Sequence, residues 1–370
     1  MNDTGNFIRV LVVDDSAFMR TALRRMIESD PGLRVIDTAS DGIEGVEKAI
    51  QLRPDVITMD IEMPRMTGLD ALSRIMDVAP CPVIMVSSLT RHHAEATIEA
   101  LHRGAYDFLS KDLSYASLDI VRIKDDLVDK CKAAARLSRR RPASASSPAA
   151  QRNSIAAATA PAIPKSMLRH KLIHVPQIVC IGTSTGGPKA LQRILPMLPM
   201  GFPAPIVIVQ HMPPGFTEPF ARRLDSLCHL HVKESEPNET LQAGTIYIAR
   251  AGEHLRIVRK GTSASAQMSV DPADSAHIPS VDVMMLSAAA QFSSRAMGVI
   301  LTGMGCDGLQ GMTAIQRAGG YTVGEDEQSC VVYGMPRACA EAGVVRTVLP
   351  LDNIPGEMVR AVEATTAARA

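Results

Sequence analysis

The chain has 370 residues, of which 46% are hydrophobic and 21% charged, a length and composition typical of a globular protein with two domains. Its 39 basic and 39 acidic residues cancel, and it has no tryptophan and 3% aromatic residues. The balanced charge disfavours a protein that mainly binds nucleic acid or an anionic membrane, and the scarcity of aromatic rings disfavours a platform for stacking single-stranded bases.

The net charge of zero hides three segments of different charge. Residues 1–130 carry 15 basic and 22 acidic residues, a net charge of −7. Residues 131–170 carry 8 basic residues and no acidic ones, whereas residues 171–370 carry 16 basic and 17 acidic residues. The distribution predicts an acidic domain, a basic connection and a nearly neutral domain.

The cysteines and the apolar runs indicate in which cellular compartment the protein is expected. The seven cysteines form no C-x-x-C pair, which favours reduced thiols over a disulfide framework or a zinc site. The amino terminus lacks the basic and then apolar layout of a signal peptide, and no apolar run approaches the roughly 18 residues that cross a bilayer. We therefore expect a soluble, cytoplasmic protein.

The first domain, expected over residues 1–130, alternates β-branched runs with amphipathic stretches, the pattern of a parallel α/β sheet. Its expected strands are Arg9–Val13, Arg34–Asp37, Asp55–Met59, Val83–Val86 and Ala105–Leu109. Helices are expected over 17–28, 43–52, 68–78, 92–102 and 114–136. These five strand–helix units predict one doubly wound (βα)5 domain.

Polar side chains follow four of these strands. Asp14 and Asp15 follow the first strand, Asp60 the third, Ser87 and Ser88 the fourth, and Lys111 the fifth. Because ligands bind at the carboxyl ends of parallel strands, these side chains should share one pocket. Three converging carboxylates favour Mg²⁺, and a nearby lysine and hydroxyl suit a phosphoryl group, which an aspartate can accept covalently. A single aspartate after a strand is more often a helix cap, so the prediction depends on the joint pattern.

The stretches LVVDDSAFMR, DVITMDIEMPRMTGLDAL, VIMVSSLT and GAYDFLSKD resemble the receiver domain of bacterial two-component response regulators. The resemblance implies a role for each polar residue of the pocket: Asp60 as phosphoacceptor, Asp14 and Asp15 as the acidic pair, Ser87 as the switch hydroxyl, and Lys111 as the family's lysine. It also implies that Phe108 is the aromatic switch, and that Mg²⁺ is held by Asp15, Asp60 and the backbone carbonyl of Glu62.

Residues 131–172 are expected to connect the domains. Of the 24 residues 142–165, 9 are alanine, 4 serine and 4 proline, so the stretch cannot bury enough apolar area to offset the entropy lost on ordering. One interpretation is a solvated, flexible linker. The other is that its basic residues, Arg139–Arg141 among them, dock an acidic partner or the acidic first domain.

The second domain, expected over residues 173–370, repeats the α/β alternation and predicts a mostly parallel sheet. Its expected strands are Gln177–Ile181, Ile206–Val209, Thr245–Ala249, Leu255–Val258, Met297–Leu301 and Tyr321–Val323. Helices are expected to begin near Pro188, Thr217, Val281, Leu309 and Pro336.

Three strand ends of this domain carry the residues of a serine hydrolase. Ser184 lies in a G-x-S-x-G run, whose small residues allow a tight strand-to-helix turn with an exposed hydroxyl. The N–H groups at the start of the following helix could face an oxyanion. His211 ends a second strand and could be the base, and Asp307, beyond a third, could orient it. The order Ser–His–Asp differs from that of α/β-hydrolases, so we expect a separate fold with the same chemistry.

The other candidates lack partners in the sequence. Cys306 has no evident base beside it, and the remaining histidines complete no metal or catalytic pattern. We expect these to be surface or structural residues: His174, His229, His231, His254 and His277.

The stretches IGTSTGGP, VQHMPPGFT, PSVDVMMLSAA, LTGMGCDG and VGEDEQSCVVYGMP resemble the catalytic domain of the chemotaxis methylesterase family, CheB. The resemblance implies that Ser184 is the nucleophile, His211 the general base and Asp307 the acid that orients it, with Met304 near the oxyanion. It further implies that the unphosphorylated receiver packs over the catalytic cleft.

Together the two resemblances imply a phosphorylation-activated enzyme of chemotaxis adaptation. It would demethylate glutamate methyl esters and deamidate glutamines on chemoreceptors, accept phosphate from a chemotaxis histidine kinase, and need no cofactor in its catalytic domain. The residues alone reach only a serine hydrolase joined to a receiver. Two alternatives stay open: a phospho-switched binding module that does not use its triad, and a hydrolase of another ester or amide. A DNA-binding output is disfavoured by the nearly neutral second domain and the lack of a helix-turn-helix pattern.

Overall fold

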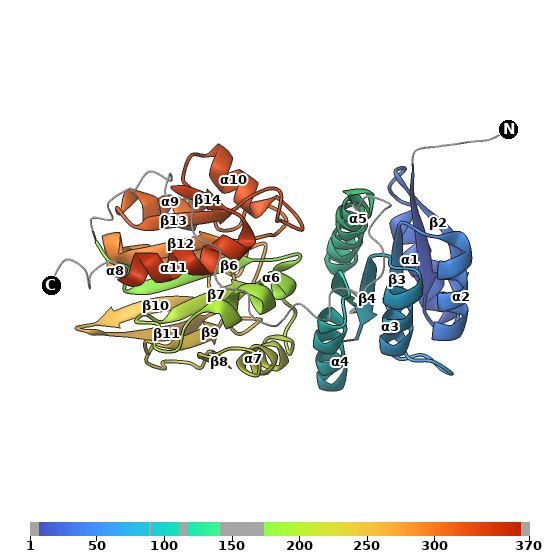
Figure 1. Cartoon of the computed structure of the whole chain (residues 1–370), viewed down its shortest axis with the longest axis horizontal. Helices are drawn as coiled ribbons and strands as arrows, with labels where there is room; N and C mark the ends of the chain where they lie inside the picture. The colour runs from blue at the N-terminus through green and yellow to red at the C-terminus, as the bar shows by residue number, and fades with distance from the viewer. Residues whose placement is uncertain (1–6, 89, 112–116, 141–173, 364–370) are drawn as a thin grey trace, which may run out of the picture.

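The computed structural model describes residues 7–88, 90–111, 117–140 and 174–363. Two α/β domains follow one another along the chain and lie side by side, the first in blue to teal and the second in green to red (Figure 1). Most of the expected linker, residues 141–172, lies outside the described residues. In the parts of the chain that are described, no helix is both long and apolar enough to span a bilayer.

The first domain is the predicted doubly wound fold. Its five strands are all parallel, in the order β2-β1-β3-β4-β5. The strands are β1 (Ile8–Val13), β2 (Leu33–Ala39), β3 (Val56–Asp60), β4 (Val83–Ser87) and β5 (Asp107–Ser110). The helices are α1 (Ala17–Ile27), α2 (Gly42–Leu52), α3 (Gly68–Val78), α4 (Arg91–His102) and α5 (Ser117–Arg140). Helix α5 therefore includes residues 131–140, which the sequence assigns to the linker.

Alternation along β1 explains why helices cover both faces of this sheet. Val10 and Val12 belong to the cluster that contains residues of α1 and α5, whereas Leu11 and Val13 belong to the cluster that contains residues of α2 and α3. Because β2 lies on one side of β1 and β3 on the other, the strand order reverses at β1. A crevice for ligands is expected at such a point.

The second domain contains a parallel sheet of seven strands, in the order β14-β13-β12-β6-β7-β9-β8. The strands are β6 (Ile178–Thr183), β7 (Ile206–Gln210), β8 (His231–Glu234), β9 (Thr245–Ile248), β12 (Ala296–Ile300), β13 (Tyr321–Glu325) and β14 (Thr347–Leu349). The helices are α6 (Gly187–Ile194), α7 (Thr217–Asp225), α8 (Val281–Phe292), α9 (Leu309–Arg317), α10 (Met335–Glu341) and α11 (Ile354–Glu363).

One predicted strand does not join this sheet. Leu255–Val258 lies within β10 (His254–Lys260), which pairs with β11 (Ser263–Ser269) in a separate antiparallel hairpin. The hairpin is tied to α8, because the N–H of Ile257 donates to Oγ of Ser287 at 2.8 Å. Three strands and one helix were not predicted: β8, β11, β14 and α11.

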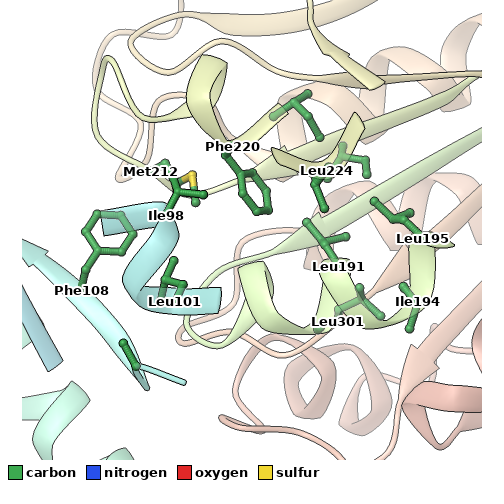
Figure 2. Close-up of a cluster of buried hydrophobic side chains, with 14 of the residues drawn as sticks. Ile98, Leu101, Phe108, Leu191, Ile194, Leu195, Met212, Phe220, Leu224 and Leu301 are labelled. Atoms are coloured by element: carbon green, nitrogen blue, oxygen red, sulfur yellow. The ribbon is translucent and has the colours of Figure 1, made fainter. Parts of the chain in front are cut away.

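The two domains share an apolar interface (Figure 2). From the first domain, Ile98 and Leu101 of α4 and Phe108 of β5 lie in one buried cluster with residues of the second. The ring of Phe108 stacks on that of Phe216 with centroids 5.0 Å apart and planes 9° apart. At the exposed edge, Arg222 of α7 donates to Glu95 of α4 at 2.7 Å.

The interface lies beside the ends of the central strands of the second domain. Its partners there are α6, which follows β6, and Met212 and α7, which follow β7. Val331 and Val332, in the loop before α10, pack against the first domain's cluster that contains residues of α5. The first domain therefore contacts the segments that immediately follow β6 and β7.

Candidate functional site

The structure brings the predicted acidic residues of the first domain together. Asp14 and Asp15 follow β1 and Asp60 ends β3, and ligand oxygens of all three lie within 4.8 Å of one another. Nζ of Lys111, just after β5, lies 2.9 Å from Asp14 Oδ2 and 2.6 Å from Asp60 Oδ2. This set of hard oxygen donors, with Asp15 exposed and the other two buried, fits a divalent cation such as Mg²⁺.

Burial and charge oppose one another in this pocket. Burial raises the pKa of Asp60, and the hydrogen bond and positive charge of Lys111 offset this only in part. Burial also lowers the pKa of Lys111, but its bonds to Asp60 and Asp14 outweigh burial and leave the pKa raised. Lys111 therefore stays positively charged and provides the fixed cation of the pocket.

Of the remaining predicted residues of the first domain, Ser87 and Glu62 contact α4, and Phe108 lies in the interface. Ser87 is buried, and its Oγ accepts a hydrogen bond of 2.9 Å from Oγ1 of Thr97 on α4. Phe108 is 5% exposed and lies in the interface. Glu62 is exposed, two residues beyond Asp60, and its carboxylate lies 3.2 Å from Nε2 of His93.

The second site begins at the turn after β6. Thr183 ends the strand, Ser184 follows, and Gly186 has a φ of +79° and caps α6. Glycine adopts this left-handed conformation without the steric cost that a Cβ brings. A Cβ on Gly187 would collide with Oε1 of Gln210 and Oγ1 of Thr183. Gly186, the last residue of the G-x-S-x-G run, and Gly187 after it therefore permit a tight turn that a larger residue would disrupt.

Strand register places the serine and the histidine side by side. Thr183 of β6 pairs with Gln210 of β7, so Ser184 and His211 leave neighbouring strands at the same level. Nε2 of Gln210 donates to the backbone carbonyls of both Ser184 and His211, at 3.0 Å each. The N–H of His211 donates to the carbonyl of Thr183 at 3.1 Å. The backbone of the two residues is therefore locked together.

His211 and Asp307 form a direct pair. Nε2 of His211 lies 2.8 Å from Oδ2 of Asp307, and the two side chains are 9% and 11% exposed. Nδ1 of His211 is buried and has no hydrogen-bond partner among the described residues. Because the carboxylate fixes the proton on Nε2, Nδ1 is the basic nitrogen of the ring.

The Asp307 carboxylate lies at the amino terminus of α8. The N–H groups of Val281 and Asp282 donate to it at 2.7 and 3.0 Å, and Oγ of Ser280 donates at 2.9 Å. Burial raises the pKa of Asp307, but the bond and charge of His211 and these N–H groups outweigh burial and hold the pKa well below its ordinary value. The carboxylate stays charged and can stabilise a positive imidazole.

Met304 lies in the loop that runs from β12 to Asp307. This loop is hydrogen-bonded to the turn that carries Ser184. The N–H of Ser184 donates to the carbonyl of Thr302 at 3.1 Å, and Oγ1 of Thr302 donates to the carbonyl of Thr185 at 3.0 Å. A Cβ on Gly303 would lie 2.9 Å from Cβ of Ser184. The partly exposed Met304 therefore follows a residue that touches Ser184.

Three residues that contact the predicted triad residues were not predicted to do so from the sequence. Gln210 and Ser280 lie within the quoted stretches VQHMPPGFT and PSVDVMMLSAA, but no spacing marks them as residues of the site. His277 is exposed, in keeping with the expected surface residue, and its ring also stacks on that of His211 with centroids 3.9 Å apart. Of the other histidines, His254 is fully buried and His231 bonds to Asp225 at 3.0 Å.

Comparisons with known proteins match both domains. Residues 179–358 match the family model of the CheB methylesterase, and residues 10–121 match that of the response regulator receiver domain. The chain is 46% identical over 368 residues to protein-glutamate methylesterase/protein-glutamine glutaminase 1 of Oleidesulfovibrio alaskensis, covering 96% of this chain and 99% of that protein. The protein-glutamate methylesterase/protein-glutamine glutaminase of Pyrococcus abyssi is 44% identical over 360 residues, covering 97% of this chain and 95% of that protein. The crystal structure of the Thermotoga maritima CheB methylesterase catalytic domain matches with 43% identity and a TM-score of 0.49, over 50% of this chain and 98% of that one.

Proposed function

The chain belongs to the CheB methylesterase family, and from this membership we propose that it is a phosphorylation-activated serine hydrolase that demethylates glutamate methyl esters and deamidates glutamines on chemoreceptors. The observation that carries the proposal is the pairing of His211 with Asp307 beside Ser184, at the carboxyl ends of three adjacent strands. The proposed units are a receiver over 1–130, a linker over 131–172 and a catalytic domain over 173–370. With its seven cysteines free, the protein is proposed to act in the cytoplasm.

The first step would use the ring nitrogen that Asp307 leaves available. Nδ1 of His211 takes the proton of Ser184 Oγ as that oxygen attacks the carbonyl carbon of the ester side chain. The imidazole becomes positive, and the charged carboxylate of Asp307 stabilises it across the 2.8 Å contact. Proton transfer by a positioned base of this kind contributes about 10²- to 10⁴-fold.

The tetrahedral intermediate would form beside the start of α6 and the loop with Met304. Backbone N–H groups at a helix amino terminus favour an anion there. The intermediate collapses to an acyl-enzyme on Ser184, and the leaving methoxide takes the proton from His211 and departs as methanol. Water then gives a proton to His211 and attacks the acyl-enzyme. The bond to Ser184 Oγ breaks, the serine oxygen takes the proton back from His211, and the glutamate side chain is freed as the acid, which ionises to the carboxylate. For a glutamine side chain the leaving group is ammonia.

In the receiver, the proposed phosphoacceptor is Asp60. One of its carboxylate oxygens would attack the phosphorus of a kinase phosphohistidine, whose imidazole leaves. Asp15, Asp60 and the backbone carbonyl of Glu62 would hold Mg²⁺, which neutralises charge on the phosphoryl oxygens when bound. Lys111 adds a fixed positive charge close to the same carboxylates, while Asp14 completes the acidic set.

Regulation would follow from the interface in Figure 2. A phosphoryl group on Asp60 would attract the Ser87 hydroxyl, which at present accepts a hydrogen bond from Thr97 of α4. Helix α4 packs against α6 and α7, and Phe108 stacks on Phe216. A shift of Ser87 and Phe108 would therefore loosen the contact beside the catalytic turn and increase access to it.

Methanol release by the variant Ser184→Ala tests the assignment. The variant lacks the attacking oxygen, so methanol release from a methylated receptor should fall below detection while the circular dichroism spectrum and unfolding temperature stay those of the parent protein. A folded Ser184→Ala protein that still released methanol at the parent rate would refute the proposal. Parent protein that hydrolysed other esters but no receptor would favour a different hydrolase.

A further inference from the structure

We propose that His277 is a positioning residue of the triad: its ring, stacked on that of His211, fixes the plane of the imidazole that takes the proton of Ser184 in the proposed reaction. This rests on the proposed function, since it concerns the base of that reaction. The two ring centroids are 3.9 Å apart, and the planes differ by 16°. This is face-to-face contact between two aromatic rings rather than incidental proximity.

The hydrogen bond between His211 and Asp307 alone leaves one rotation of the His211 ring unrestrained. Asp307 bonds Nε2 of His211 at 2.8 Å, and a single hydrogen bond at one ring atom does not prevent the ring from turning about that contact. Nδ1 has no hydrogen-bond partner among the described residues, so it adds no second anchor. A flat ring packed on one face supplies the missing restraint, because turning His211 would drive its edge into His277.

The loop that carries His277 is fixed at both ends by one buried histidine. Nδ1 of His254 accepts from the N–H of Ser280 at 3.1 Å, so its Nε2 is the donor to the carbonyl of Pro272, also at 3.1 Å. The N–H of Gly252 donates to the carbonyl of Ile278 at 3.2 Å. His277 therefore projects from a short segment with fixed ends, which makes it suitable for holding another side chain.

The stack also shields the base. His277 is itself exposed, whereas the side chain of His211 beneath it is 9% exposed. Removal of the His277 ring would expose one face of the His211 ring to water. Water near the imidazole would weaken its attraction to Asp307 and compete with Ser184 for Nδ1.

The test uses full-length protein with two substitutions, His277→Ala and His277→Phe. The alanine variant loses the stack, so kcat for a methylated receptor should fall about 3- to 10-fold with KM unchanged. The rate at which a fluorophosphonate probe labels Ser184 should fall by the same factor, because the probe needs the base but not receptor binding. Phenylalanine keeps a flat ring over His211 and should restore most of both rates.

The matched control is His231→Ala, which removes an exposed histidine bonded to Asp225 and should leave both rates unchanged. His277→Gln provides a second variant without an aromatic ring if the alanine variant unfolds early. Labelling of His277→Ala at the parent rate, a phenylalanine variant as slow as the alanine variant, or a rise in KM alone would each overturn the inference. Failure of the parent protein to label at Ser184 would instead overturn the proposed function.

Discussion

The carboxylate of Asp307 accepts four hydrogen bonds in the described structure, two at each oxygen. Oδ1 accepts from Ser280 Oγ and the N–H of Asp282, and Oδ2 accepts from His211 and the N–H of Val281. In an asparagine at this position, an NH2 group replaces one of the two carboxylate oxygens. An atom that accepts two hydrogen bonds is thereby exchanged for one that donates. Asp307→Asn should therefore lower kcat by about 10²- to 10⁴-fold and destabilise the protein by about 1–3 kcal/mol at neutral pH. Steady-state kinetics and urea unfolding measure the two effects.

The stability difference should itself depend on pH. The folded protein holds the pKa of Asp307 below its ordinary value of 3.8, so the ionised carboxylate stabilises the fold above that pH. This contribution is lost as the pH falls below 3.8 towards the folded pKa. The difference in free energy of unfolding between the parent protein and Asp307→Asn should be constant at higher pH and should narrow towards about pH 3. A gap that widened on acidification would contradict the described bonds.

At the residue scale, sequence reasoning identified side chains that the structure brings together and missed one that contacts them through a loop. Asp307 and His211 could be predicted because each follows a strand of a parallel sheet, where functional side chains gather. His277 could not, because it contacts His211 through a loop whose path depends on His254 and Ser280. No local periodicity or spacing links these positions along the chain.

At the element scale, the turn from β6 into α6 requires that Gly187 have no side chain. In Gly187→Ala the new Cβ would collide with Gln210 and Thr183. Gln210 bonds the turn to β7, and Thr183 bonds it to Thr302 beyond β12. Overpacking of this kind costs about 1–3 kcal/mol, and displacement of Ser184 should lower kcat at least about 10-fold. Differential scanning calorimetry and methanol release measure the two effects.

Gly356→Ala is the matched control for that change. Gly356 lies in α11, and a Cβ there meets nothing within 4 Å. Alanine has the higher helix propensity, so this variant should be as stable as the parent or more so, with full activity. Equal loss of activity in both variants would show that the turn at Gly187 has no special requirement for glycine.

Long, strongly patterned elements could be predicted from the sequence, and short or edge elements could not. The central strands β6, β7 and β12 are continuous apolar runs and were expected. β14 has three residues and β8 four, both at sheet edges, while β11 consists mostly of serine and alanine, which favour strands weakly. Their pairing is supplied by neighbouring strands rather than by their own composition.

At the scale of the whole molecule, charge predicted the segments but not how the domains meet. The receiver is acidic, yet its contact with the catalytic domain is mainly apolar, with Ile98, Leu101 and Phe108 buried there. The ion pair between Arg222 and Glu95 lies at the exposed edge, where such pairs contribute little. Apolar residues on a helix of an α/β domain read as core in a sequence, so this interface could not be predicted.

Ile98→Asp tests whether this interface restrains the enzyme. Ile98 is 3% exposed and packs towards α7, so a carboxylate there would be buried without a partner in the docked state. Separation of the domains relieves that cost, and basal methanol release without a phosphodonor should rise about 10-fold or more. Ile50→Asp, at an exposed position of α2, is the control and should leave basal activity unchanged. Unchanged or lower activity of Ile98→Asp would argue that docking does not restrain the active site.

The central claim is that Ser184, His211 and Asp307 hydrolyse the side-chain esters of receptor glutamates under control of the receiver. The most direct measurement is mass spectrometry of a methylated chemoreceptor after incubation in heavy-oxygen water with full-length enzyme, with and without a phosphodonor. We predict that methyl groups are lost from glutamate side chains, that one heavy oxygen enters each new carboxylate, and that the phosphodonor accelerates both. Methyl groups that remain in place with phosphorylated enzyme, while a fluorophosphonate still labels Ser184, would contradict the claim.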